Sequence, residues 1–289
     1  MNGPFIAVDW GTSNRREYLI EGSRVVAGSR DDRGILEMDG RGYEEAIAAI
    51  RAEHGDWPVL IAGMAGSNRG WREAPYVDAP ARGQDIAARL LWVEPGRTAI
   101  VPGVAWRNPD APNVMRGEEV QLLGAVAANL APPDALLAQP GTHNKWVEME
   151  GGAIGRFSTA MTGELFALLR DHSILSRQLG DAITVGPAFL DGVRDAGTRP
   201  LIATLFGARA GVLLGYRDEA DMADYVSGLL IGADVAAADV AGRDAYILSD
   251  ATLGDLYAAA VTAFGGTPRA VDTLAAFVAG MALIWSVVT

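Results

Sequence analysis

The chain has 289 residues, 49% of them hydrophobic, so it can bury a large core and we expect it to form two lobes. Its formal net charge of -12 argues against binding of nucleic acid or of an anionic membrane, because both require a basic face. The absence of cysteine excludes disulfides, thiolate nucleophiles and cysteine-bound metals. The N-terminal "MNGPFIAVDWG" has no basic leader, so we expect a cytoplasmic protein.

The first predicted element is an apolar strand that ends at Asp9 and leads into a Gly-Thr loop at Gly11 and Thr12. A second strand, a tight turn at Gly22 and a third strand complete a predicted hairpin. A Gly-Thr turn exposes backbone N–H groups and a hydroxyl, which suits phosphate oxygens. Asp9 is either a turn-forming aspartate or a carboxylate that positions Mg²⁺ beside phosphates, and the loop context favours the second role.

The middle of the first half alternates helix and strand, and its periodicity predicts a helix over 42–54, strands over 58–63 and 98–103, and a helix over 113–130. The polar loop "GMAGSNRGWREAPY" is too long to be a simple turn. Glu118 and Glu119 are either first-turn carboxylates favoured by the helix dipole or site carboxylates. Glu118 is the better candidate for a general base, because it follows Arg116-Gly117, where glycine lets a ligand approach the backbone.

A second copy of the hairpin is expected 130 residues further along the chain. The shift places Gly141, Thr142, Asn144, Lys145 and Gly152 on Gly11, Thr12, Asn14, Arg15 and Gly22. Lys145 is the only lysine among 24 basic residues, which suggests a need for a compact ammonium, although a codon preference for arginine explains it equally. His143 lies inside the second loop as a candidate ligand contact. Two hairpins of one design predict two lobes of related topology, whose turns could clamp a polyphosphate.

The rest of the chain is predicted to be mostly helical, over 162–170, 182–195, 198–206 and 219–240, followed by a strand over 245–249 and a helix over 251–264. The uncharged run 273–289 falls short of the roughly 20 apolar residues that a membrane span needs, so we expect a buried final helix. Strands with interleaved helices in two lobes indicate an α/β fold. The sequence contains neither a Walker loop nor a Rossmann glycine motif.

Six blocks in order carry a family resemblance: "AVDWGTSN", "AGMAGSNRGW", "NVMRGEE", "PGTHNKWV", "MTGEL" and "SGLLIGA". They resemble the 2-keto-3-deoxygalactonokinase family within the actin, hexokinase and Hsp70 superfamily of sugar kinases. The resemblance implies two ribonuclease-H-like lobes, residues 1–130 and 131–289, with the ligand cleft between them and a final helix 273–287 that could pack back on the first lobe. It also implies ATP-dependent phosphorylation of the terminal C6 hydroxyl of 2-dehydro-3-deoxy-D-galactonate in galactonate breakdown.

Carried onto this chain, the resemblance assigns roles to individual residues. Asp9 would position Mg²⁺, and Glu118, Asp9 and Glu119 are the catalytic candidates. The expected ATP contacts are Gly11, Thr12, Asn14, Gly141, Thr142, His143, Lys145 and Thr252. The expected sugar-acid contacts are Ser67, Asn68, Arg69, Trp71, Arg116 and Glu164. A buried carboxylate of the substrate needs bidentate donors, which Arg69, Arg72 or Arg116 could supply.

One position departs from the family pattern. In "SDAT", Asp250 could repel a phosphate group of the nucleotide or could cap the helix 251–264, and we favour the cap. The alternatives left open are a kinase for another 2-keto-3-deoxy sugar acid and a nucleotide-binding sensor without catalysis. The expected partners are ATP and a small sugar acid, without nucleic acid or membrane, and a homodimer remains an option.

Overall fold

The computed structural model describes residues 3–38, 42–180 and 182–288. The chain divides into two compact units. The first comprises Met1–Asp134, Glu148–Phe157 and Asp272–Thr289, and the second comprises Ala135–Val147 and Ser158–Val271. A single division at residue 130 therefore does not describe these units, because the tip of the second hairpin and the C-terminal segment belong with the first unit.

The first unit is built on a six-stranded sheet in the order β3-β2-β1-β4-β7-β6. Its strands are β1 Phe5–Trp10, β2 Arg15–Glu21, β3 Arg24–Asp31, β4 Val59–Gly63, β6 Leu91–Glu94 and β7 Thr98–Ile100. β1, β2 and β3 form an antiparallel meander, whereas β1, β4 and β7 run parallel. The central strands β1 and β4 are almost wholly buried, as their unbroken apolar sequences "FIAV" and "VLIA" predict.

Helices and a smaller sheet complete the first unit. The helices are α1 Ile35–Met38, α2 Tyr43–His54, η1 Met64–Gly66, α3 Gly83–Ala87, α4 Glu118–Ala127 and α10 Thr273–Ser286, and the smaller sheet pairs β5 Tyr76–Asp78, β8 Gly103–Trp106 and β9 Asn113–Met115. α4 and α10 pack very closely, because a β-carbon on Gly124 would lie 1.8 Å from the Ala276 carbonyl oxygen. The predicted buried final helix is confirmed as α10. Among the described residues, no helix combines the length and hydropathy that a membrane span requires.

The second unit repeats the plan of the first sheet. Its strands β10 Leu136–Gln139, β11 Asn144–Glu150, β12 Ala153–Ala160, β13 Asp244–Leu248 and β14 Thr267–Val271 lie in the order β12-β11-β10-β13-β14. This order corresponds strand for strand to β3-β2-β1-β4-β7, so the hairpin repeat seen at a shift of 130 is confirmed. Both hairpins turn at glycines with positive φ, +64° at Gly22 and +81° at Gly152, a backbone conformation that favours glycine.

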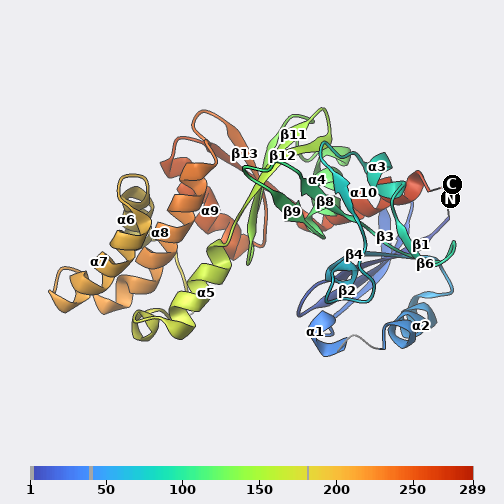
Figure 1. Cartoon of the computed structure of the whole chain (residues 1–289), viewed down its shortest axis with the longest axis horizontal. Coiled ribbons are helices and arrows are strands. Elements are labelled where there is room, and N and C mark those ends of the chain that lie inside the picture. Colours follow the sequence, from blue (N-terminus) through green and yellow to red (C-terminus); the bar gives the residue numbers. More distant parts are fainter. Residues whose placement is uncertain (1–2, 39–41, 181, 289) are drawn as a thin grey trace. The chain divides into compact units, whose positions relative to one another are not determined.

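The helices of the second unit are α5 Thr162–His172, η2 Ser176–Gln178, α6 Pro187–Ala196, α7 Leu201–Leu213, η3 Glu219–Asp221, α8 Met222–Ala237 and α9 Ala251–Ala263. α8 is buried along most of its length and packs against α6 (Figure 1). Glycines allow this contact: a β-carbon on Gly228 would lie 2.1 Å from the Phe189 carbonyl oxygen, and one on Gly192 would lie 2.2 Å from that of Tyr225.

Two predicted elements differ from the structure. The helix predicted over 113–130 is wrong in its first part, because Asn113–Met115 is strand β9 and helix α4 begins at Glu118. Gly117, with φ of +104°, separates the two elements. The helix predicted over 198–206 extends to Leu213, and strand β14 and the three-stranded sheet were not predicted. Short strands carry too few residues for the period of two to stand out.

Candidate active site

Three segments of the first unit meet at the carboxyl ends of β1 and β4. Asp9 pairs in register with Ala62, and Trp10 with Gly63. A β-carbon on Gly63 would lie 2.7 Å from the Trp10 carbonyl oxygen, and one on Gly117 would lie 3.0 Å from the Gly63 Cα atom. The start of α4 therefore rests against the end of β4, which in turn lies against the end of β1. Ligands of open α/β sheets bind at this edge, outside the carboxyl ends of parallel strands.

Asp9 is the carboxylate at this edge, and its side chain is 25% exposed. Burial raises the pKa of Asp9 above its ordinary value, the Arg16 guanidinium 3.1 Å from Oδ2 opposes that rise, and the charge of Glu118 adds to it. Glu118 is therefore close enough to Asp9 for its charge to act on this carboxylate. A partly desolvated carboxylate of this kind gains from an added cation.

Glu118 and Glu119 have different surroundings, although they are neighbours on α4. Glu118 is half-buried, and its Oε2 accepts the Arg116 N–H at 2.9 Å. Glu119 is fully buried, and its Oε2 accepts the Gly117 N–H at 2.7 Å. Burial, and then the charge of Glu118, raises the pKa of Glu119 to about 8. Of the pair, only Glu118 keeps surface through which a substrate could be reached.

The loop after β4 is folded tightly upon itself. A β-carbon on Gly70 would lie 2.3 Å from the Met64 carbonyl oxygen, so this position requires glycine. Ser67 is buried, and its Oγ accepts the Arg69 N–H at 3.3 Å. Trp71 stacks on Tyr43 with ring centroids 5.6 Å apart and planes at 5°, which anchors the loop to the core. Three predicted or candidate substrate contacts are exposed on this loop: Asn68, Arg69 and Arg72.

Arg116 stabilises the end of the same loop through two contacts. Its Nη2 donates to the Ala74 carbonyl oxygen at 2.8 Å, and its guanidinium lies 4.4 Å from the centroid of the Tyr76 ring. The buried Nε and Nη1 atoms have no hydrogen-bond partner among the described residues. Arg116 is therefore a half-buried residue that fixes the loop.

The first Gly-Thr loop lies beside this carboxylate edge. The Gly11 N–H donates to the Asn14 carbonyl at 2.9 Å, which closes the turn, and a β-carbon on Gly34 would lie 2.2 Å from the Thr12 carbonyl oxygen. The side chains of Thr12 and Asn14 are exposed, and Asn14 Oδ1 accepts a 3.3 Å hydrogen bond from Arg30. Arg15 instead points into the protein, where it pairs with Glu17 at 2.9 Å and Asp31 at 2.6 Å.

The second Gly-Thr loop, which belongs to the second unit, lies against the first turn of α5. A β-carbon on Gly163 would lie 2.6 Å from the Gly141 carbonyl oxygen, and the Glu164 N–H donates to the Thr142 carbonyl at 3.0 Å. The structure brings two predicted site residues together here, because His143 Nε2 lies 2.5 Å from Glu164 Oε2. Both side chains are partly exposed.

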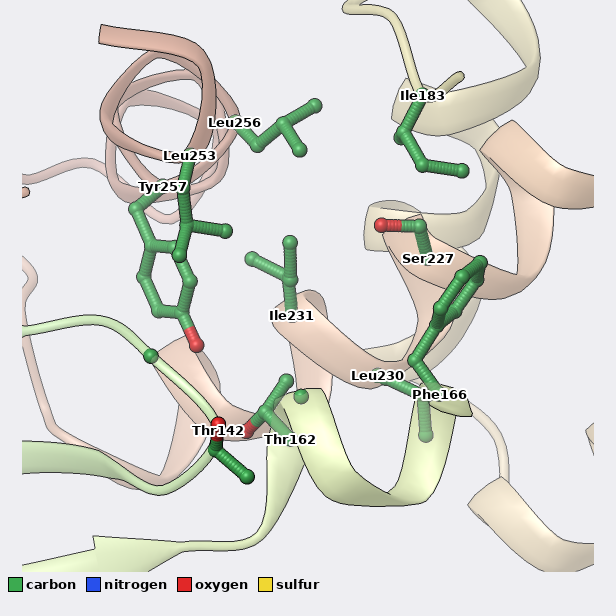
Figure 2. Close-up of a pocket in the computed structure, with 12 residues that line it drawn as sticks. Thr142, Thr162, Phe166, Ile183, Ser227, Leu230, Ile231, Leu253, Leu256 and Tyr257 are labelled. Atoms are coloured by element: carbon green, nitrogen blue, oxygen red, sulfur yellow. The ribbon is translucent and has the colours of Figure 1, made fainter. Parts of the chain in front are cut away.

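An apolar pocket of about 300 Å³ begins at this loop. Side chains from α5, α8 and α9 face a common space, with Thr142 and Thr162 at its lower end (Figure 2). The lining residues are Gly141, Thr142, Thr162, Gly163, Phe166, Ile183, Ser227, Leu230, Ile231, Leu253, Leu256 and Tyr257. An apolar cavity that begins at a Gly-Thr turn suits a ligand with a flat apolar part and a charged tail.

Asp234 is a functional candidate that the sequence analysis missed. This carboxylate of α8 is 6% exposed and accepts four hydrogen bonds. Its Oδ2 accepts from Asn144 Nδ2, Thr162 Oγ1 and the Tyr257 hydroxyl at 2.6–2.8 Å, and its Oδ1 accepts from Trp146 Nε1 at 2.9 Å. Burial and the neighbouring Asp234 raise the pKa of Tyr257. The available signal was one aspartate inside the otherwise uncharged stretch "VSGLLIGADVAAA".

Three other predicted positions lie around the second loop and α9. Lys145 is 4% exposed on β11 and is not among the residues that line the pocket. Thr252 is exposed in the first turn of α9, next to the pocket residue Leu253. Asp250 caps α9, because its Oδ1 accepts the Leu253 N–H at 3.0 Å, which confirms the capping interpretation.

Among the described residues, one acidic group has ligand atoms spaced for a metal ion, namely Glu17, Glu53 and His54. Glu17 already contacts Arg15 at 2.9 Å, and His54 Nε2 lies 3.3 Å from its other oxygen. The guanidinium supplies the positive charge that this carboxylate needs, so the group is an internal ion-pair network.

Two sheets that share one strand order, each opened by a Gly-Thr hairpin, define an α/β protein of the actin and hexokinase class. A fold of this class is also found in the activator of 2-hydroxyisocaproyl-CoA dehydratase from Clostridium difficile with bound ADPNP, which has a TM-score of 0.51, 11% sequence identity and coverage of 98% of this chain and 94% of that chain.

Within that class, the family model for 2-keto-3-deoxy-galactonokinase matches residues 9–284, and the chain belongs to this family. The 2-dehydro-3-deoxygalactonokinase of Escherichia coli strain K12 is 37% identical over 290 residues, 97% of each chain. A crystal structure of a Sinorhizobium meliloti protein provisionally given the same name superimposes with a TM-score of 0.89 at 37% identity, covering 98% of this chain and 97% of that chain.

Proposed function

We propose that this kinase transfers the terminal phosphoryl group of ATP to the C6 hydroxyl of 2-dehydro-3-deoxy-D-galactonate. The family match and the name of the Escherichia coli relative support the substrate. The observation that carries the chemistry is the placement of Glu118, which is held by the Arg116 N–H and electrostatically coupled to Asp9 at the carboxyl ends of β1 and β4.

The pocket of the second unit is the proposed nucleoside site. Its apolar walls suit a purine ring, and the Gly141-Thr142 turn at its end suits the phosphates. Gly11 and Thr12 are the matching phosphate contacts from the first hairpin. His143 lies in this loop and Glu164 lies beside it, and we propose that His143 contacts ATP and Glu164 the sugar acid. Asp234 positions the pocket indirectly, through its hydrogen bonds to Thr162 and Tyr257.

Asp9 is the proposed residue for Mg²⁺. A quarter of its side-chain surface is exposed to solvent, and burial of the rest raises its pKa. A cation at this position would therefore stabilise the ionised form. Mg²⁺ commonly binds through one or two carboxylates together with phosphate oxygens and water, and one carboxylate at this edge fits that pattern. When bound, Mg²⁺ neutralises charge on the phosphate oxygens.

Glu118 is the proposed general base. As the substrate oxygen forms its bond to the γ-phosphorus and the bond between that phosphorus and the bridging oxygen of ATP breaks, the hydroxyl proton passes to a Glu118 carboxylate oxygen. ADP leaves with the electron pair of the broken bond. The hydrogen bond from the Arg116 N–H to Oε2 fixes the position of this carboxylate.

The carboxylate of the substrate is the remaining charge to be bound. We propose that the loop after β4 supplies the donor, from Arg69 or Arg72, because both side chains are exposed, whereas the guanidinium of Arg116 is buried against Ala74 and Tyr76. Alanine in place of the binding arginine should raise KM for the sugar acid strongly. Unchanged KM in both single variants would show that the donor lies elsewhere.

The deciding experiment measures ADP release across a panel of 2-keto-3-deoxy sugar acids, including the galactonate and gluconate epimers. We expect the galactonate epimer to have the highest kcat/KM, and preference for another acid would refute the proposed substrate.

Glu118→Gln should lower kcat by roughly 10²- to 10⁴-fold with little change in KM. Glu21→Gln, at an exposed position on β2, is the matched control and should keep normal turnover. Near-normal turnover of Glu118→Gln would assign the base to another residue.

A further inference from the structure

Helix α7 of the second unit has an apolar face turned toward water. Its sequence "LIATLFGARAGVL" contains a single charged residue, Arg209, whose Nη1 donates to the Ile174 carbonyl at 2.8 Å. One face packs inward through Thr204 and Ala208, which are buried. The opposite face and the turn that follows expose large apolar side chains: Ile202 by 86%, Phe206 by 64%, Leu213 by 69%, Leu214 by 67% and Tyr216 by 81%. A helix that is apolar on all sides is typical of a buried helix.

The exposed area is close to what a dimer interface uses. At about 25 cal/mol per Å², burial of a large apolar side chain corresponds to roughly 100 Å² of surface, so five such side chains exposed by 64% or more offer about 400 Å². A standard interface buries about 800 Å² per partner, somewhat over half of it apolar, or roughly 450 Å². The face on α7 and the turn after it therefore matches the apolar share of one side of such an interface.

A groove of about 410 Å³ runs beside these exposed side chains. Ala203, Gly207 and Gly211, spaced four residues apart, are among its lining residues, and a β-carbon added to Gly207 would meet no atom within 4 Å. The neighbouring row of the helix carries Ile202 and Phe206 as projecting groups. A ridge and an adjoining groove on one helix are complementary to the same surface rotated by a two-fold axis.

The far wall of the groove is held in place by polar contacts. The Arg217 guanidinium lies 3.5 Å from the centroid of the Tyr225 ring, and the Tyr225 hydroxyl donates to Asp195 at 2.6 Å. Arg199 and Arg217 each lie 3.5 Å from the same carboxylate. A wall fixed in this way loses little conformational freedom when a partner enters, which favours binding.

The charges around the groove favour a second copy of this chain over a membrane. The chain as a whole carries -12, but the groove is lined by Arg199 and Arg217, and each of them lies 3.5 Å from the Asp195 carboxylate, so these charges are paired locally. Two acidic copies can therefore approach here without strong repulsion. An anionic lipid surface would instead need a basic rim around the apolar face.

We propose that α7 packs against α7 of a second copy around a two-fold axis, with Phe206 of each copy entering the groove at Gly207 of the other. The interface requires neither the sugar-acid site nor the nucleotide pocket, so this inference is independent of the proposed function. The chain acts as a homodimer through the second unit.

Sedimentation equilibrium of the full chain tests the proposal. The wild type should have twice the 30.4 kDa mass of one chain at micromolar concentration, and Phe206→Glu should shift it to the monomer. Phe206 is largely exposed, so the charge should not prevent folding, which circular dichroism and retained kinase activity would verify. Leu36→Glu, at a position 67% exposed on α1, is the matched control and should remain dimeric. A monomeric wild type, or a Phe206→Glu dimer, would overturn the proposal.

A second measurement locates the interface directly. Because the chain has no cysteine, one introduced thiol is unique. Ile202→Cys treated with a short bismaleimide should give a covalent dimer, whereas Leu36→Cys should stay monomeric. Dimer formation by Leu36→Cys alone would place the interface elsewhere and refute the proposal. Flotation of a monomeric wild type with anionic vesicles, lost in Phe206→Glu, would assign the face to a membrane and likewise overturn it.

Discussion

Glu119 predicts a pH-dependent loss of stability that can be isolated with one substitution. The side chain is fully buried at the start of α4, Oε2 accepts the Gly117 N–H, and Oε1 has no hydrogen-bond partner among the described residues. Burial is the largest cause that raises its pKa from 4.5 to about 8, followed by the charge of Glu118. The folded protein therefore holds a proton on Glu119 at neutral pH.

The sign of the effect follows from the two pKa values. Below pH 4.5 the carboxyl is protonated in both the folded and the unfolded state, so its burial carries no ionisation cost. Between pH 4.5 and about 8 the unfolded chain ionises while the folded chain does not, and the free energy of unfolding falls. The loss is about 1.4 kcal/mol per pH unit, or on the order of 4 to 5 kcal/mol over the whole window.

Glu119→Gln keeps the shape of the protonated side chain and removes the titration. Urea unfolding at pH 5, 6, 7 and 8 should show the variant about as stable as the wild type at pH 5. The variant should be more stable by several kcal/mol at pH 8, with the gap widening as the pH rises. Glu21→Gln, which is exposed, should show no such trend. A difference between Glu119→Gln and wild type that stays constant with pH would refute the raised pKa.

Two further predictions concern packing and the pocket. Gly280→Ala would place a β-carbon 1.9 Å from the Val120 carbonyl oxygen, so α4 and α10 must separate. Urea unfolding should show that this variant loses about 2 to 3 kcal/mol of stability. The control Gly254→Ala, whose β-carbon would lie 3.8 Å from its nearest neighbouring atom, should lose no stability. Asp234→Asn replaces an acceptor with a donor among four donors, so it should destabilise the chain by roughly 1 to 3 kcal/mol and raise KM for ATP more than KM for the sugar acid. Equal effects on both KM values would argue against a positioning role at the pocket.

The sequence by itself determined the elements whose signal is local. The paired hairpins could be predicted because Gly11-Thr12 and Gly141-Thr142 recur at a fixed shift, and the turn glycines mark where each strand must reverse. The buried strand after residue 58, the C-terminal helix and the cap at Asp250 are set by short stretches of sequence. Their hydrophobic period or hydrogen bonds are local, so no distant contact was needed to predict them.

The tertiary structure decided everything that depends on which side chain reaches which neighbour. Position in the repeat equated Asn14 with Asn144, yet one is exposed and the other hydrogen-bonds Asp234 inside the second unit. Glu118 and Glu119 are alike in sequence, and only the packing of α4 buries the second completely. Burial and hydrogen bonding are set by residues far apart in the chain, as the 90-residue separation of Asn144 and Asp234 shows, and no local pattern encodes them.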